Sequence, residues 1–220
     1  MYYLAMGKIR TYDNLESIIN NNSQKRKREI VSLKNICNSL AKNKNTYEQS
    51  VLLKSLVVIS YSHFEGFVKD ATKSYFEFIN TVSLKSNNVN LKLLSSYIQY
   101  LYLSNTLSKV DLIETIQNLL ERSIPITYKS DFFSNTESNL KYEVLQKILV
   151  RSGFDGDSFL NEKVFIDNVI LLNRNNFAHG DSLYNVDKEI SYQIADKIID
   201  YIDLYRNIIL NAVANKSYER

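Results

Sequence analysis

The stretch LLKSLVVISYSHFEGFVKDATKSYFEF, residues 52–78, decides the fold. Its apolar side chains do not keep to one face of a helix but cover most of its circumference: Leu52, Leu53, Leu56, Val57, Ile59, Phe64, Phe67, Val68, Ala71, Tyr75 and Phe78. A helix that is apolar on nearly every side packs against neighbours on several sides. We therefore predict a long central helix from about Tyr47 to Val82.

The rest of the chain contains few residues that break helices. Its 220 residues include one proline and five glycines, so long helices are the expected structure. The stretch SDFFSNTESN, residues 130–139, is a loop by composition. Helices are predicted over residues 13–42 (weakened at Asn20–Asn22), 91–103, 109–122, 140–150, about 161–180, and from an N-cap at Asp187 to about 215.

These elements predict an all-α fold. The architecture is an up-and-down helical bundle with extra helices inserted between the second and third long helices. No internal repeat and no low-complexity linker divides the chain. We therefore expect one domain over residues 1–220, with an N-terminal helical region at 1–44 and an insert at 85–139.

The composition leaves the class of partner open. A net charge of +3 permits an anionic partner without requiring one. Cys37 is the single cysteine, so no intramolecular disulfide can form, and such a chain suits the reducing cytoplasm. The start MYYLAMGKIRTYDN lacks the pattern of a secretory signal, and no apolar run approaches the roughly 20 residues of a membrane span. We predict a cytoplasmic protein.

A polar motif ends the helix that is predicted to stop at Gly180. The run NRNNFAHG, residues 173–180, contains Arg174, Asn175 and His179. On an ideal helix Asn175 and His179 share a face, and Arg174 points about 140° away from His179. A cation near a helix C-terminus stabilises the macrodipole; alternatively, His179 transfers protons and Arg174 clamps a phosphate. Spacing alone does not choose between these readings.

Two motifs resemble those of a known superfamily. The run NRNNFAHG is similar to the signature of the HEPN superfamily (higher eukaryotes and prokaryotes nucleotide-binding domains), whose ribonuclease members carry Arg, usually followed by Asn, and a His four to six residues after the Arg. Arg174, Asn175 and His179 occupy those places. YSHFEGF, residues 61–67, resembles a segment of a bacterial branch related to the RiboL-PSP type, found among defence and toxin–antitoxin genes. The resemblance covers about residues 45–80 and 140–212.

The resemblance implies a dimer in which two Arg–His motifs share a cleft. It implies metal-independent RNA cleavage without a cofactor, giving a 2′,3′-cyclic phosphate. His179 would assist proton transfer, Arg174 would stabilise the charge on the phosphate, and Asn175 would orient the site. RNA, a second copy of the chain, and an antitoxin or defence-system protein are the implied partners. Some HEPN toxins carry a modified tyrosine two residues after the histidine; Asp181 stands there, so that control is not expected.

Other charged residues are weaker candidates. Glu65 is expected either to pair with Arg174 or line the same cleft, or else to form an ordinary buried salt bridge or occupy an exposed edge position. His63 is expected to be a core or interface histidine that supports the site at most. The basic run Lys25, Arg26, Lys27 and Arg28 is either an RNA-binding patch or a solvated helix face. Two other functions remain open: a HEPN-like module that binds RNA, nucleotide or protein without cleavage, and a helical subunit of a larger complex.

Overall fold

The computed structural model describes residues 9–40, 46–104, 109–137, 139–178 and 187–220. These residues form helices and two isolated β-bridges, so the predicted all-α class is confirmed. The elements are α1 (Tyr12–Leu40), α2 (Thr46–Val82), α3 (Leu91–Leu103), α4 (Lys109–Glu121), α5 (Ser130–Phe133), α6 (Tyr142–Arg151), a 3₁₀ turn (Leu160–Glu162), a π-helix (Phe165–Leu171), α7 (Leu172–Ala178) and α8 (Lys188–Ala214).

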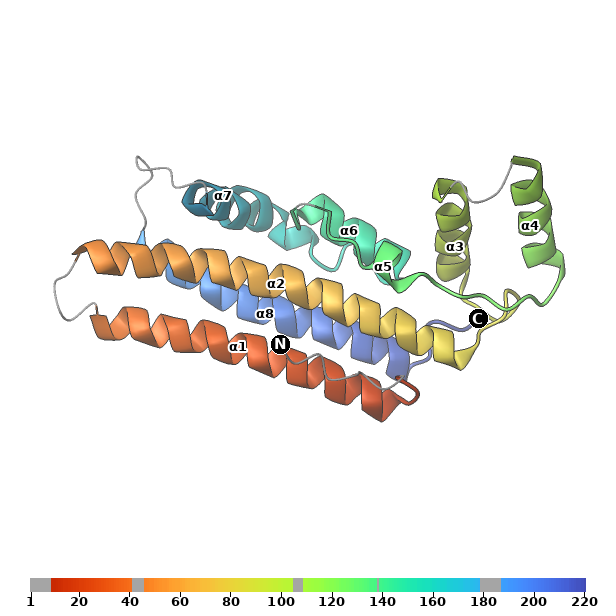
Figure 1. Ribbon diagram of the computed structural model, residues 1–220, viewed down its shortest axis with the longest axis horizontal. Coiled ribbons are helices and arrows are strands. Elements are labelled where there is room, and N and C mark those ends of the chain that lie inside the picture. The colour runs from red at the N-terminus through yellow and green to blue at the C-terminus, as the bar shows by residue number, and fades with distance from the viewer. Residues whose placement is uncertain (1–8, 41–45, 105–108, 138, 179–186) are drawn as a thin grey trace.

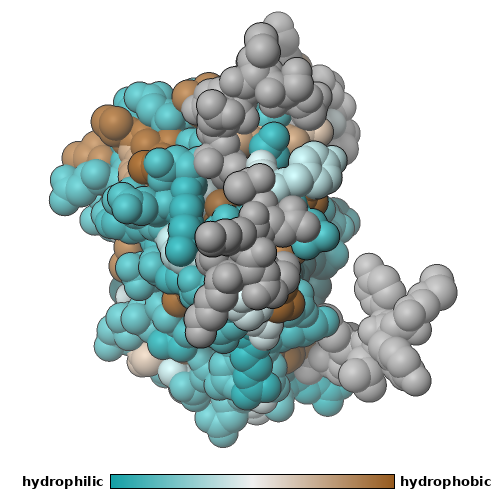
Figure 2. All heavy atoms as spheres, turned by 90° about the vertical axis from the view of Figure 1, so that its left-hand side faces the viewer, coloured by the Kyte–Doolittle hydropathy of each residue, from teal (hydrophilic) through white to brown (hydrophobic). Residues whose placement is uncertain are grey.

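The three long helices lie side by side, with α1 running opposite to α2 and α8 (Figure 1). The short helices α5, α6 and α7 form a second layer on α2 (Figure 1). The inserted helices α3 and α4 stand at the end of the bundle where α2 finishes. At the opposite end, hydrophilic residues cover most of the visible surface and hydrophobic ones occur in smaller groups (Figure 2).

Helix α2 is the centre of the bundle, as predicted. Phe64 and Phe67 are at most 1% exposed, and their rings pack on Tyr201 and Tyr205 of α8 at 5.6 and 6.4 Å between centroids. Burying such a side chain contributes about 2–3 kcal/mol. The expectation that no apolar run approaches a membrane span is wrong by length and composition, since Tyr47–Val82 in α2 is a candidate span. Its neighbours α1, α5, α7 and α8 cover its sides, which is the environment of a core helix.

Helix α1 continues without a break through Asn20–Asn22, so the predicted weak point there is wrong. Asparagine usually weakens a helix because its amide competes for nearby backbone groups. Asn22 instead binds other side chains: its amide nitrogen donates to Asp70 at 3.2 Å, and its oxygen accepts from Arg26 Nε at 2.5 Å. Tertiary contacts with α2 therefore override the local preference.

The other corrections concern short elements. Residues 130–139 are not all loop, because Ser130–Phe133 forms the single turn α5. Phe133 is fully buried and its ring lies 4.6 Å from that of Phe76, which draws the turn onto α2. The helix predicted over 161–180 is divided into a 3₁₀ turn, a π-helix and α7, and its predicted end at Gly180 lies outside the described residues.

The prediction for α8 is confirmed, since the carboxylate of Asp187 accepts from the Ile190 backbone nitrogen at 2.8 Å.

Candidate functional site

The helix that carries the polar motif reaches α2 through a π-helical stretch. Ile166 and Ile170 in this stretch are buried, and the side chain of Asn173 donates to the Val169 carbonyl at 2.8 Å, across the junction with α7. A π-helix holds more residues per turn than an α-helix, so it rotates the residues that follow. In the last turns of this helix Arg174 lies over the ring of Tyr61, a buried residue of α2.

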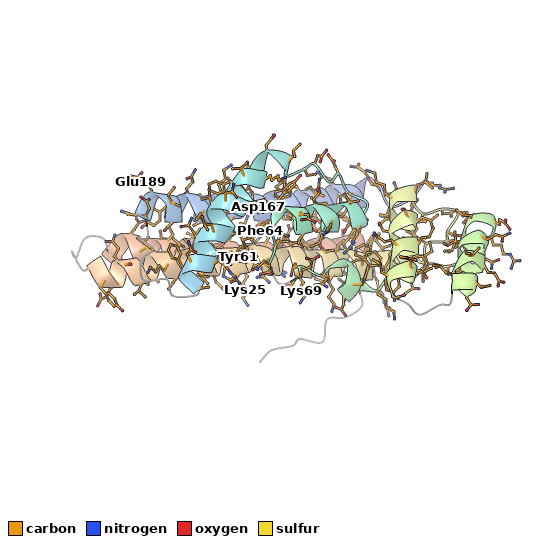
Figure 3. The ribbon with its side chains drawn as sticks, turned by 90° about the horizontal axis from the view of Figure 1, so that it is seen from above. Lys25, Tyr61, Phe64, Lys69, Asp167 and Glu189 are labelled. Atoms are coloured by element: carbon orange, nitrogen blue, oxygen red, sulfur yellow. The ribbon has the colours of Figure 1, made fainter. Side chains whose placement is uncertain are left out.

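The guanidinium of Arg174 is held by neutral groups. Nη1 donates to the side-chain oxygens of Asn139 at 3.1 Å and of Asn175 at 2.8 Å. Cζ lies 5.1 Å from the ring centroid of Tyr61. Figure 3 shows Tyr61 on α2 where α7 crosses it. The residue is half-buried, Nε is buried without a hydrogen-bond partner, and the ion pairs of the described residues do not include Arg174. Among the described residues, the positive charge is therefore positioned without a directly bonded carboxylate.

Tyr61 contacts both Arg174 and the segment that carries Asn139. Its ring faces Arg174, and its hydroxyl accepts a hydrogen bond of 2.6 Å from the Leu140 backbone nitrogen. Leu140 follows Asn139, so Tyr61 also fixes the segment that supplies the Asn139 oxygen. Burial and, to a lesser extent, the charge of Glu65 raise the pKa of Tyr61 to about 12. The phenol therefore stays protonated at neutral pH.

Glu65 lies one turn after Tyr61 on the same face of α2. Burial raises the pKa of Glu65, against the opposite effects of a hydrogen bond with Thr136 and of the positive charge of Arg174. No ion pair within 4 Å joins Glu65 to Arg174 in the described part of the chain. Glu65 therefore belongs to the electrostatic surroundings of Arg174 without contacting it directly.

His63 and Gly66 occupy the side of α2 that faces α1. His63 Nε2 lies 3.1 Å from Glu29 Oε2, but its geometry is not that of a hydrogen bond. Burial lowers the pKa of His63 although Glu29 raises it, so the imidazole is neutral at pH 7. The Gly66 backbone touches Arg26: a Cβ atom on Gly66 would lie 2.6 Å from Arg26 Nη1. These two motif residues thus serve the α1–α2 contact.

The basic run on α1 contains two side chains in ion pairs and two that are exposed. Arg26 Nη2 and Lys27 Nζ form ion pairs of 2.7 and 2.6 Å with Asp70 and Asp203. Lys25 and Arg28 are exposed. RNA binding by this run stays a prediction, and it would depend mainly on the two exposed side chains.

A protein-family model described as RiboL-PSP-HEPN matches residues 21–211. The chain belongs to this family. The match contains both YSHFEGF and RNNFAHG and runs from the middle of α1 into α8, so it also includes the insert that the two motifs alone did not cover. Neither a curated protein nor a solved structure matches the chain significantly.

Within this RiboL-PSP-HEPN domain the structure brings together Arg174 and Asn175, with Glu65 nearby. His179 lies outside the described residues, which reach Ala178 at the end of α7. Two contributors, Asn139 and Tyr61, were not among the predicted site residues. Asn139 was assigned to a loop and carries no recognisable signal; the contacts of Tyr61 could have been suspected only from its place one turn before Glu65.

Proposed function

We propose that this RiboL-PSP-HEPN domain is a metal-independent endoribonuclease that acts in the cytoplasm as a toxin or phage-defence effector. The observation that supports it is the state of Arg174, a half-buried guanidinium whose partners are two amide oxygens and an aromatic ring. By contrast, the half-buried Arg26 and Lys27 each have a carboxylate. Removing a cation from water without a counter-ion is costly. An anion that binds Arg174 offsets this cost, which strengthens its binding.

A phosphodiester is the anion that suits this geometry. The planar guanidinium presents donors in a fork that matches two phosphate oxygens. Asn139 and Asn175 hold Nη1, so that the fork does not have to be ordered when the ligand binds. Arg174 would then stabilise the additional negative charge that develops on the phosphoryl oxygens in the transition state.

In the proposed reaction the 2′-oxygen of the substrate attacks the adjacent phosphorus. The bond from phosphorus to O2′ forms and the bond to O5′ breaks, which leaves a 2′,3′-cyclic phosphate and a free 5′-hydroxyl. One proton leaves the 2′-hydroxyl and one joins the departing 5′-oxygen, so the step has no redox change. We assign His179 to one of these proton transfers because its ordinary pKa lies near neutrality. A homodimer would supply a second copy of Arg174 and His179 to the same cleft.

The experiment is RNA cleavage by the purified protein in EDTA, with product ends analysed. The wild type is expected to produce 2′,3′-cyclic phosphate ends, and His179→Ala and Arg174→Ala are expected to lose activity while keeping their helical content. Arg122→Ala, an exposed arginine beyond α4, is the matched control and should cleave normally. RNA binding without any cleavage by the folded wild type would refute the nuclease and favour a binding module.

A further inference from the structure

A second cation lies where α2 and α7 cross. Lys54 precedes Tyr61 by seven positions on α2, so the two residues share a face. Its Nζ lies 5.8 Å from the ring centroid of Phe177, which follows Arg174 by three positions on α7. The crossing therefore holds two reciprocal contacts: Arg174 of α7 lies on a ring of α2, and Lys54 of α2 lies on a ring of α7.

Lys54 resembles Arg174 in its surroundings. It is half-buried, and the ion pairs of the part of the chain that the structure describes do not include it. Other half-buried lysines of the long helices, such as Lys27 and Lys34, have aspartate partners at 2.6 and 2.5 Å. An aromatic face attracts an ammonium group but accepts none of its hydrogen bonds in the way that an oxygen does. Lys54 therefore keeps donors for an anionic ligand.

We propose that Lys54 binds the phosphate that neighbours the scissile phosphate on a single-stranded RNA. The inference rests on the proposed function, which assigns the scissile phosphate to Arg174. Seven residues correspond to a rise of about 10 Å along α2. The spacing of neighbouring phosphates in an extended strand, together with the reach of a lysine side chain, covers this span. A compact ammonium suits a phosphate that is held in place, whereas the arginine fork suits the one that reacts. The site accordingly takes at least two consecutive phosphates.

The first test measures binding without cleavage. The probe is a single-stranded oligonucleotide whose 2′-oxygens are methylated, so that no 2′-hydroxyl can attack. Lys54→Ala and Lys54→Gln are expected to weaken its binding about fivefold and to reduce the slope of log affinity against log salt by about one. Lys163→Ala is the matched control, because Lys163 Nζ also lies on a ring, 5.6 Å from the centroid of Tyr142, away from the α2–α7 crossing. It should bind like the wild type.

The second test compares cleavage of two substrates. A dinucleoside monophosphate has one phosphate and should be cleaved equally well by wild type and Lys54→Gln. A longer RNA should show a higher KM in the variant with an unchanged kcat. Equal losses on both substrates would overturn the subsite, and so would equal weakening of oligonucleotide binding by the Lys54 and Lys163 variants.

The two proposals fail in distinguishable ways. If Arg174→Ala weakens oligonucleotide binding and the Lys54 variants do not, the subsite is refuted and the proposed nuclease site stands. If neither Arg174→Ala nor the Lys54 variants change the affinity, the subsite is refuted, and the proposed nuclease is refuted separately if Arg174→Ala and His179→Ala cleave RNA like the wild type. Thermal unfolding of each variant shows whether a loss comes from the fold, and Lys54→Gln keeps the first two methylene groups of the side chain.

Discussion

Replacing Gly66 by alanine should have opposite effects on stability in two backgrounds. Gly66 lies inside α2, where alanine is favoured over glycine by about 1 kcal/mol. The new Cβ, however, would lie 2.6 Å from Arg26 Nη1 and 2.9 Å from Nη2. The guanidinium would have to shift, which would strain or break its hydrogen bonds with Asp70, at 2.7 Å, and with the His63 carbonyl, at 3.3 Å.

The cost of moving Arg26 exceeds the gain in helix propensity. Two hydrogen bonds from a charged donor contribute about 1.5–3 kcal/mol each at most, and water recovers part of this because the Asp70 side chain is 48% exposed. A net loss of about 2 kcal/mol set against a gain of about 1 kcal/mol predicts that Gly66→Ala destabilises the wild type by about 1 kcal/mol. In an Arg26→Ala background no guanidinium opposes the Cβ, so the same change should stabilise by about 1 kcal/mol.

The assay is urea unfolding of the four proteins of this double-mutant cycle, followed by far-UV circular dichroism at one protein concentration. The coupling free energy between positions 26 and 66 should be about 2 kcal/mol. A Gly66→Ala change with the same sign and size in both backgrounds would refute the reasoning that the glycine is required by the Arg26 contact.

Two further predictions concern the surroundings of Arg174. Asn139→Ala should lower the rate of RNA cleavage about tenfold without unfolding the protein, because one hydrogen bond that orients Arg174 is lost. Asn139→Asp should weaken RNA binding as well, since a carboxylate there neutralises the guanidinium. Unchanged kinetics in both variants would exclude the role of Asn139. Glu65 has a folded-state pKa above its unfolded value of 4.5. Between these two pKa values the folded protein retains a proton that the unfolded chain releases. The free energy of unfolding should therefore fall as pH rises from about 4.5 through the folded pKa. Urea titrations across that pH window should show a smaller fall for Glu65→Gln, and an identical pH dependence would contradict the assignment.

The HEPN resemblance and the family match agree. The sequence motif indicates Arg174 and Asn175 directly, and the structure shows that these two side chains bond to each other. The motif YSHFEGF looks like one unit in the sequence, yet the structure divides it between two contacts. Tyr61 and Glu65 face the Arg174 side, while His63 and Gly66 face α1. A helix turns about 100° per residue, so adjacent motif residues necessarily serve different neighbours.

The sequence by itself determined the features that depend on local chemistry and on patterns within one segment. The position of α2 follows from apolar residues on all its sides, and the start of α8 follows from the capping side chain of Asp187. Only the tertiary structure decided the continuity of α1 through Asn22, the turn at Phe133 and the partner of Arg174. Asn139 stands 35 positions before Arg174. Contacts over such separations arise from how helices pack, and packing energy overrides the weak local preferences that a single sequence reveals.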